Sequence, residues 1–442
     1  MASRFESLTV LRHFAAARAV RHPDRAALMR WQQRRLGRFL AHTLPQAPYY
    51  APWAGKPLEA LPIADKALMM REFDGFNTRG IRREQAMAIA LRAERSRDFR
   101  PAIGGITVGL SSGTSGNRGL FLVSAAERLR WAGIVLARAL PRRMLARLLS
   151  PWREPPCIAF FLRANSNLYT TLSSSRLRFD YYDLLEPMER HAARLADSAP
   201  DVLVAPASVL RILALYALDG RLRIEPQHVV SVAEVLEADD VPPIERAFGQ
   251  PVHQLYQCTE GFLGYTCALG GLHLNETYVH VEPEWLDAER TRFVPIVTDF
   301  TRETQLIVRY RLNDVLRVAE PCACGRAERT LAAVEGRTDD VLWLADASGA
   351  AGMKPVFPDF VRRAMLLAGD SVRDYRVRQR DGELEVALDA DSVERSGALV
   401  ARELNSLWDE LRVRPPHVRF AGLPPVAAGA KRRRVECVGG AR

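Results

Sequence analysis

The sequence predicts an α/β protein with a large N-terminal domain over residues 1–336 and a small α+β C-terminal domain over residues 337–442. The main observation lies between 200 and 260, where near-continuous apolar strands alternate with helices, a pattern typical of a parallel sheet. A more β-rich subdomain is expected from 277 to 318, before the shorter elements of the C-terminal domain. With 442 residues, 48% of them hydrophobic, the chain can build two or three cores.

Turn and capping signals locate the first strands and the helix after them. Alternating apolar residues over 102–110 and the apolar run 120–123 predict two strands. Ser124 and Glu127 have the spacing of a capping box, which predicts a helix that ends before Pro141.

The other elements follow from hydrophobic periodicity. Helices are expected over 8–43, 208–218, 243–248, 358–367 and 393–411; strands are expected over 202–204, 229–232, 252–256 and 373–389, with a hairpin over 340–356. Parallel α/β sheets bind ligands at the carboxyl ends of their strands. That rule places Glu234 and residues 257–260 at a binding site.

The basic composition does not by itself indicate a polyanion partner. The net charge is +10, but only 4 of the 62 basic residues are lysines, and the arginines are scattered. Nucleic-acid binding needs a clustered basic face, so no nucleic-acid partner is expected.

The sequence has no apolar run of the ~18–20 residues that span a membrane and no secretory pattern at its start. We therefore expect a cytoplasmic protein with no membrane partner; a homodimer is left open.

A loop rich in serine, threonine and glycine lies between the first two predicted strands. Its candidate phosphate-binding residues are Ser111, Ser112, Gly113, Thr114, Ser115, Gly116 and Gly119. Small residues let backbone N–H groups approach phosphate oxygens, and hydroxyls add donors. A Walker loop would need a lysine and an immediate helix, and the sequence has neither. A flexible linker is the alternative for this segment alone.

Four further motifs follow the loop in order. They are Tyr256–Glu260, Tyr310–Asp314, Gly336–Asp340 and Gly429–Arg434. An aromatic ring at a strand end could stack on a base, a glutamate could bind magnesium, and an aspartate could accept both ribose hydroxyls. Taken singly, any of these motifs could be a turn or a solvated charge run, and each of the last three favours that structural interpretation.

The order and spacing of the five motifs resemble those of the adenylate-forming superfamily, which includes acyl-CoA synthetases and nonribosomal adenylation domains. The segments Leu61–Lys66 and Arg309–Leu316 look like the branch of phenylacetate–CoA ligases and CoF synthetases. The resemblance implies ATP-dependent activation of a carboxylic acid, of the aryl class, to an acyl-adenylate. It also implies transfer of the acyl group to CoA or another acceptor, and a mobile C-terminal domain.

The resemblance also implies a role for each motif residue. The loop from Ser111 to Gly119 would hold the pyrophosphate part of ATP. The other implied ATP contacts are Glu234 and Tyr256 at the adenine, Thr259 at the α-phosphate, and Asp314 and Arg337 at the ribose. Glu260 would bind magnesium, and Asp339 would be the hinge of the mobile domain. Lys431 would reach the carboxylate of the acid and the α-phosphate of ATP. Thr259, Glu260 and Lys431 would thus form the catalytic group.

Electrostatics supports the implied role of Lys431. Attack of a carboxylate on a phosphoryl group brings anions together, so a positive point charge stabilises the transition state. A lysine kept in an arginine-rich chain fits that need, although a basic solvated tail is the alternative.

The motifs also depart from the family pattern. Asn117–Arg118 replaces proline–lysine in the loop, Leu312–Asn313 replaces threonine–glycine, and Gly429–Ala430 leaves the register of the lysine open.

Three cysteines and one histidine could form a structural zinc site. Cys267 and His273 make one short ligand pair, and Cys322 and Cys324 make the other. Three thiolates and an imidazole complete a tetrahedral shell, which could contribute on the order of 10 kcal/mol to folding. The alternative is four unrelated residues, because free cysteines are often small buried hydrophobes. Six cysteines in a long chain of this kind argue against a disulfide framework.

Three alternatives to acid activation with CoA remain. The enzyme could adenylylate a phenolic hydroxyl, as CoF synthetases do, or it could transfer an acyl group to a hydroxyl or amine acceptor other than CoA. The alternative outside enzymes is a basic protein that binds nucleic acid or a membrane surface. The expected small-molecule partners are an acid and its acceptor, with ATP and magnesium as cofactors.

Overall fold

The computed structural model describes residues 4–96, 98, 102–110, 119–150, 152–162, 176–349, 352–369, 371–424 and 433–438, without the Leu149 side chain. Contacts divide the chain into two compact units. Unit 1 comprises Met1–Leu312 and Val318–Ala333, and unit 2 comprises Asn313–Arg317 and Val334–Arg442.

Unit 1 begins with helices that pack on its later elements. They are α1 (Arg4–Ala19), α2 (Arg25–His42), α3 (Lys66–Arg71) and α4 (Arg83–Ser96), with short 3-10 turns between α2 and α4. Asp24 caps α2 by accepting a hydrogen bond from the Ala27 N–H at 2.7 Å. Helix α1 packs along α5 (Ala125–Ala139) at Gly133, where an added Cβ would lie 2.5 Å from the Cβ of His13.

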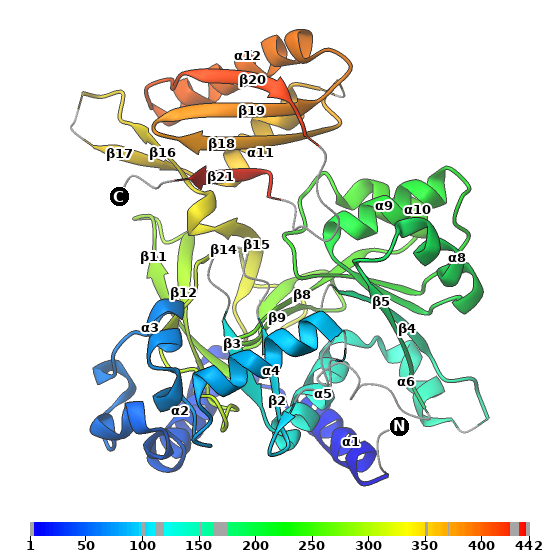
Figure 1. The fold of residues 1–442 in the computed structure, drawn as a ribbon, viewed down its shortest axis with the longest axis vertical. Coiled ribbons are helices and arrows are strands. Elements are labelled where there is room, and N and C mark those ends of the chain that lie inside the picture. The colour runs from blue at the N-terminus through cyan, green and yellow to red at the C-terminus, as the bar shows by residue number, and fades with distance from the viewer. Residues whose placement is uncertain are drawn as a thin grey trace. The chain divides into compact units, whose positions relative to one another are not determined.

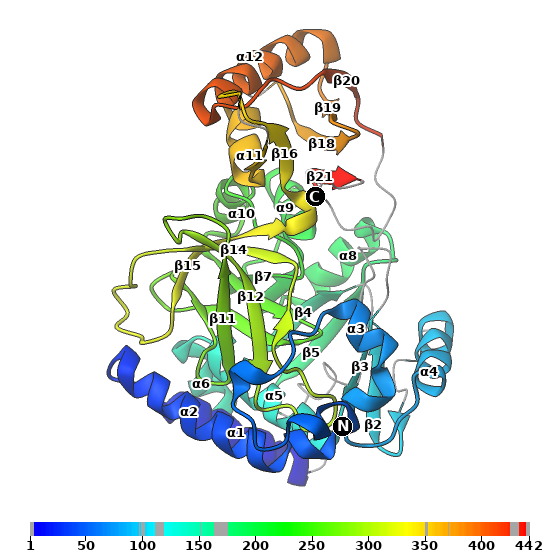
Figure 2. The same cartoon turned by 90° about the vertical axis from the view of Figure 1, so that its left-hand side faces the viewer.

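A small antiparallel sheet follows α4. It contains β1 (Ala102–Ile103), β2 (Ile106–Leu110) and β3 (Leu120–Val123) in that order, and α4 lies beside it (Figures 1 and 2). The prediction of one continuous strand over 102–110 was wrong. Gly104 and Gly105 have φ values of 54° and 81°, so the chain turns there and pairs β1 with β2.

The predicted capping box and helix are confirmed in α5. The Ser124 side chain accepts from the Glu127 N–H, and the Glu127 carboxylate accepts from the Ser124 N–H. The helix ends at Ala139, before Pro141, and α6 (Arg142–Leu149) follows.

The large sheet contains twelve described strands. In order of position they run β11-β12-β14-β15-β10-β9-β8-β7-β6-β4-β5, with β13 paired to β12. Their bounds are β4 (Cys157–Leu162), β5 (Arg178–Asp183), β6 (Val202–Ala205), β7 (His228–Val232), β8 (Val252–Cys258), β9 (Gly261–Thr266), β10 (Leu272–Leu274), β11 (Val279–Trp285), β12 (Arg292–Asp299), β13 (Tyr310–Arg311), β14 (Asp314–Val318) and β15 (Thr330–Arg337). The division between the units falls within β14 and β15.

The parallel part of this sheet is β5-β4-β6-β7-β8. Helices α8 (Met188–Ser198), α9 (Ala207–Leu218) and α10 (Val241–Phe248) cover one face (Figure 1), and their side chains share a core with Phe161 and Leu203. Leu140 and Met144 pack on the other face, against Phe160 and Val204. The predicted α/β class is confirmed, because both faces of a parallel sheet are covered.

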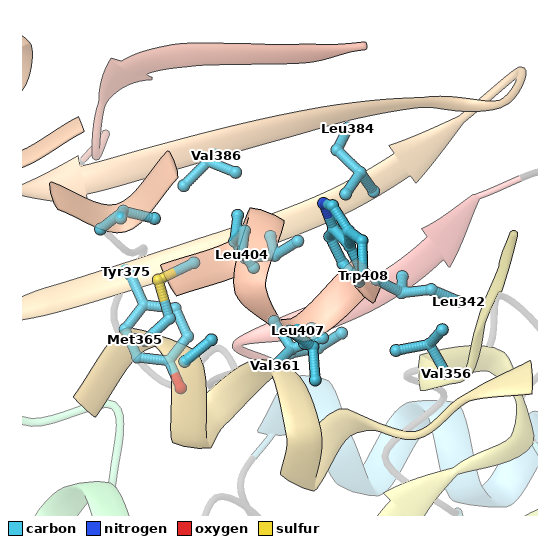
Figure 3. Packing of buried hydrophobic residues seen from close by; sticks show 14 of the residues in the cluster. Leu342, Val356, Val361, Met365, Tyr375, Leu384, Val386, Leu404, Leu407 and Trp408 are labelled. Carbon is cyan, nitrogen blue, oxygen red and sulfur yellow. The ribbon is translucent and has the colours of Figure 1, made fainter. Parts of the chain in front are cut away.

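Unit 2 is an α+β structure with its own core. Its elements are β16 (Leu342–Ala345), β17 (Met353–Val356), α11 (Pro358–Leu367), β18 (Asp374–Arg380), β19 (Glu383–Asp389), α12 (Val393–Leu411), β20 (Val418–Gly422) and β21 (Val435–Val438). β16 and β17 form the predicted hairpin, and the four remaining strands lie in the order β20-β19-β18-β21. Trp408 and Leu404 of α12 pack against Leu384 and Val386 of the sheet (Figure 3).

Among the helices described, none is long and apolar enough to cross a membrane.

Trp408 should carry a large share of the stability of unit 2. Its side chain is fully buried, yet its Nε1 has no hydrogen-bond partner among the described residues. We expect Trp408→Ala to lower the free energy of unfolding by about 3–5 kcal/mol because it leaves a cavity. Trp408→Phe should cost much less, because it also removes a buried N–H that lacks an acceptor. Denaturant unfolding measures both, with the exposed Leu366→Ala as the control. Equal losses for Ala and Phe would contradict this account.

Candidate functional site

Part of the candidate site lies outside the described residues. This applies to Ser111, Ser112, Gly113, Thr114, Ser115 and Gly116 of the loop, and to Lys431. The flanks of the loop are described: β2 and β3 are antiparallel, and Leu110 pairs with Leu120. Gly119 is buried directly before β3. The segment therefore joins two antiparallel strands, which differs from the strand–loop–helix of a Walker motif.

Tyr256, Thr259 and Glu260 lie at the point where the large sheet changes from parallel to antiparallel pairing. Tyr256 is in β8, which is parallel to β7 and antiparallel to β9, and the pairing of β8 with β9 shifts register after Tyr256. Thr259 and Glu260 form the turn, and both are half-buried. The Thr259 hydroxyl donates a hydrogen bond of 2.9 Å to Oε2 of Glu260. The turn thus presents an oriented carboxylate at a strand end.

Tyr310 is a residue of this site that the sequence analysis did not assign. Its side chain is 3% exposed, and its hydroxyl lies close enough to the Glu260 carboxylate for that charge to act on it. Burial, followed by the charge of Glu260, raises the pKa of Tyr310 well above its ordinary value, so the hydroxyl stays a donor. Its place in the Tyr310–Asp314 motif was the signal that could have identified it.

The two segments that resemble the phenylacetate–CoA ligase branch lie side by side. Ala64 donates a backbone hydrogen bond to the Arg309 carbonyl at 3.0 Å and accepts one from the Arg311 N–H at 2.8 Å. Nη1 of Arg309 also donates to the Leu61 carbonyl at 2.8 Å. Asp65 then caps α3 by accepting from the Leu68 N–H. These contacts hold the start of α3 next to Tyr310.

Glu234 lies beyond the carboxyl end of β7, the strand next to β8. Its carboxylate accepts a hydrogen bond of 3.0 Å from the Ser208 N–H, in the first turn of α9. Helix α9 has Pro206 at its N-cap and no side-chain cap there, so Glu234 supplies an acceptor that the first turn requires. This helix-capping role could not be read from the sequence, because Ser208 and Glu234 are 26 positions apart.

In unit 2, Asp314 and Arg337 come together. Oδ1 of Asp314 lies 4.0 Å from Nε of Arg337, and both side chains are partly exposed. The Thr338 N–H donates to the Asn313 carbonyl at 2.6 Å, which holds the two segments in place. A carboxylate and a guanidinium in this arrangement offer both an acceptor and donors to a hydroxylated ligand.

The segment around Asp339 is tied to the C-terminal strand through Asp340. Asp339 itself is exposed in a 3-10 turn over Thr338–Asp340. Oδ2 of Asp340 accepts from the Arg337 N–H at 2.7 Å, and Oδ1 accepts from Nε of Arg433 at 2.9 Å. Gly336 has a φ of 127°, and a Cβ there would lie 2.7 Å from the Asp340 carboxylate, so glycine is required. The chain two residues after Lys431 is thereby anchored beside Asp339.

The four predicted zinc ligands form one cluster in unit 1. The ligand atoms of Cys267, His273, Cys322 and Cys324 all lie within 4.8 Å of one another. Sγ of Cys267 is 3.7 Å from Sγ of Cys322, and Sγ of Cys324 is 3.3 Å from Nε2 of His273. In a tetrahedral zinc site with Zn–S bonds of about 2.3 Å, two sulfur atoms lie about 3.8 Å apart. The spacing therefore fits a zinc ion.

The histidine of this cluster is oriented for metal binding. Its Nδ1 lies 3.3 Å from the Glu328 carbonyl, which fixes the tautomer that leaves Nε2 free to bind a metal. Burial lowers the pKa of His273, which favours the neutral, ligating form. Gly271 is needed at the cluster, because a Cβ there would lie 2.6 Å from Sγ of Cys322.

No protein-family model and no curated protein sequence matches the chain. Solved structures do match it. A 2-hydroxyisobutyryl-CoA ligase in the postadenylation state, in complex with 2-HIB-AMP, has a TM-score of 0.63 at 18% identity, over 94% of this chain and 90% of that chain. The GH3.15 acyl acid amido synthetase has a TM-score of 0.58 at 14% identity, over 93% and 91%.

A third match is the amide bond synthetase McbA from Marinactinospora thermotolerans, with a TM-score of 0.50 at 15% identity, over 75% of this chain and 68% of that chain. At these identities the likeness concerns the fold. The chain has the fold of adenylate-forming ligases.

Proposed function

We propose that this protein activates a carboxylic acid with ATP to an enzyme-bound acyl-adenylate and then transfers the acyl group to an acceptor. The observation that carries the proposal is the turn at Thr259–Glu260. There a glutamate at a parallel strand end, in a fold shared with adenylate-forming ligases, accepts a hydrogen bond from Thr259 and lies near the Tyr310 hydroxyl. The sequence motifs around it occur in an order that resembles that of the adenylate-forming superfamily.

In the proposed reaction, a carboxylate oxygen of the acid attacks the α-phosphorus of ATP. The bond to the bridging oxygen of pyrophosphate breaks, and pyrophosphate leaves with the electron pair. Lys431 would stabilise the negative charge that develops as the anions approach. Glu260 would hold magnesium, for which carboxylate oxygens are suitable ligands, and the ion would neutralise phosphate charge. Thr259 and Tyr310 would keep the Glu260 carboxylate in one orientation.

The other motif residues would bind the nucleotide. Tyr256 would lie against the adenine, and Glu234 would reach the same region from the end of the neighbouring strand. Asp314 would accept the ribose hydroxyls, with Arg337 beside it, and Asp339 would act as the hinge. The loop from Ser111 to Gly119 would hold the phosphates.

The acceptor is CoA or another nucleophile, and the acid belongs to the aryl class if the phenylacetate–CoA ligase-like motifs determine specificity. One structure of the 2-hydroxyisobutyryl-CoA ligase contains both 2-HIB-AMP and CoA, whereas McbA is named as an amide bond synthetase. The fold is thus compatible with a thioester or an amide product. CoA and an amine should both be offered in the assay.

We expect ATP–pyrophosphate exchange with at least one acid from a panel of aryl and alkyl acids, and consumption of the adenylate when the right acceptor is added. Lys431→Ala should slow exchange by about 10²–10³-fold, because it removes a charge aimed at the transition state. The matched control is Lys354→Ala, since Lys354 pairs with Asp346 at 3.1 Å in unit 2 and has no assigned role. Lack of exchange with every acid would refute acid activation, and unchanged exchange in Lys431→Ala would refute the role of that lysine.

Tyr310→Phe should raise the magnesium concentration that gives half-maximal exchange by about tenfold, because it removes a hydroxyl donor close to the charged Glu260 carboxylate. Exchange at saturating magnesium should be largely retained. Tyr216→Phe is the control, because the Tyr216 hydroxyl donates to Glu189 at 2.9 Å on an exposed helical surface. If the magnesium dependence of Tyr310→Phe matches that of the wild type, Tyr310 does not orient a magnesium ligand.

We also propose that Cys267, His273, Cys322 and Cys324 bind a structural zinc ion. The ion would join the loop after β9 to the segment before β15, which are 55 positions apart at Cys267 and Cys322. With four protein ligands no position remains for substrate or water, so its role would be in folding.

Elemental analysis of the purified protein should find about one zinc ion per chain. Cys324→Ser should lower the zinc content and the melting temperature, because a hydroxyl replaces a thiolate ligand. Cys437→Ser, at the free cysteine of β21 in unit 2, should leave both unchanged. Wild-type protein that is fully stable without stoichiometric zinc would contradict the assignment.

A further inference from the structure

Arg138 and Arg326 both lie over the Tyr265 ring, near the end of β9 that lies away from the Thr259–Glu260 turn, and Arg18 and Arg142 are near enough for the four charges to act on one another. We call them the basic cluster: Arg18 of α1, Arg138 of α5, Arg142 of α6, and Arg326 of the segment before β15. Burial first, and then the charges of Arg142, Arg138 and Arg326, lower the pKa of Arg18. The positive charges of these arginines repel one another, and an anion that lies among them would offset that repulsion.

Arg138 is the innermost member of the basic cluster. Its side chain is 3% exposed, and its guanidinium lies 4.8 Å from the centre of the Tyr265 ring. The carboxylate that faces it is Glu328, at 3.7 Å from Nη2, which is beyond hydrogen-bond distance. Oε1 of Glu328 already accepts a hydrogen bond of 2.9 Å from Thr277. Glu328 therefore only partly compensates Arg138.

Several donors of the cluster have no acceptor within the described part of the chain. These buried atoms are Nε of Arg18, Nε and Nη2 of Arg138, and the hydroxyl of Tyr265. A buried guanidinium nitrogen without an acceptor costs free energy, and native proteins rarely leave one. The donors come from α1, α5 and β9, so they approach the cluster from three different elements.

Stacking on tyrosine does not remove this cost. Arg326 lies 5.3 Å from the centre of the same Tyr265 ring that Arg138 contacts. A cation–π contact uses the flat face of a guanidinium, whereas the N–H groups point outward from its edge. The edges still require oxygen acceptors.

We propose that the basic cluster binds a small oxyanion of the phosphate or sulfate class. A tetrahedral oxyanion has acceptor oxygens in several directions, which suits donors that arrive from separate elements, whereas a carboxylate has two oxygens in one plane. Arg138 and Tyr265 would contact it from the buried side. Arg18 and Arg326 are half-buried and Arg142 is exposed, so the anion can reach the cluster from solvent. The site uses none of the residues assigned to ATP and does not depend on the proposed ligase reaction.

The test is the melting temperature of the full chain in increasing sodium phosphate or sodium sulfate, with sodium chloride holding the ionic strength constant. We expect saturable stabilisation by phosphate and sulfate but not by chloride. Arg18→Gln should weaken the apparent affinity by about tenfold, because it removes a charged donor. Arg142→Gln, at an exposed position with little risk to folding, should weaken it as well.

The matched control is Arg12→Gln, which makes the same charge change at an exposed position of the same helix α1 and should bind like the wild type. Phosphate bound at the ATP site would persist in Arg18→Gln and Arg142→Gln. The proposal is overturned if stabilisation does not saturate, if chloride matches it, or if both Arg18→Gln and Arg142→Gln keep the wild-type affinity. Loss of binding in Arg12→Gln to the same extent would also overturn it, because the effect would then reflect net charge.

Discussion

The pairing of Ala64 with the backbone at Arg309 and Arg311 is the contact on which the candidate site of unit 1 depends. Arg309 has a φ of 43°, a left-handed conformation that costs energy for a residue other than glycine. That conformation is held because its guanidinium donates to the Leu61 carbonyl and to both oxygens of Glu282. The strained turn sets the direction of the next residue, Tyr310, whose buried hydroxyl lies near the charge of Glu260. An N-terminal segment, a strained arginine and a magnesium ligand candidate thus form one connected structure.

Glu127 shows how far a local pattern extends into tertiary structure. Its capping-box role was predictable, because it depends on the three-residue spacing from Ser124. The same carboxylate also accepts hydrogen bonds from the Glu303 and Thr304 N–H groups at 2.6 and 2.9 Å. Burial alone would raise the pKa of Glu127, but the charge of Arg302 and these hydrogen bonds lower it overall. The link between α5 and the segment after β12 spans 176 positions, and no local sequence signal contains it.

The same distinction separates the predictable from the unpredictable parts of the site. Strands β6, β7 and β8 and helices α11 and α12 were predictable, because periodicity and breakers are local. The position of Glu260 at a strand end followed from the parallel-sheet rule. The capping of α9 by Glu234 and the closeness of Tyr310 to Glu260 were not predictable, because each depends on how segments distant in the sequence pack together. The strand expected over 102–110 fails for a different reason: Gly104 and Gly105 interrupt the apolar alternation, and glycine favours the turn that forms there.

Part of the arginine-rich composition has a structural explanation in ion pairs within both units. Arg25 pairs through both terminal nitrogens with Glu276, Arg309 holds Glu282, and Arg433 donates twice to Asp340. A planar guanidinium can make such paired contacts, whereas a lysine ammonium cannot. In each of these ion pairs a carboxylate accepts hydrogen bonds from the guanidinium and balances its charge. The positive net charge alone is therefore no evidence for a polyanion partner. The basic cluster differs from these ion pairs, because four of its buried donor atoms, which come from three different elements, have no acceptor among the described residues. The unmatched hydrogen-bonding capacity, more than the total charge, is what indicates a ligand there.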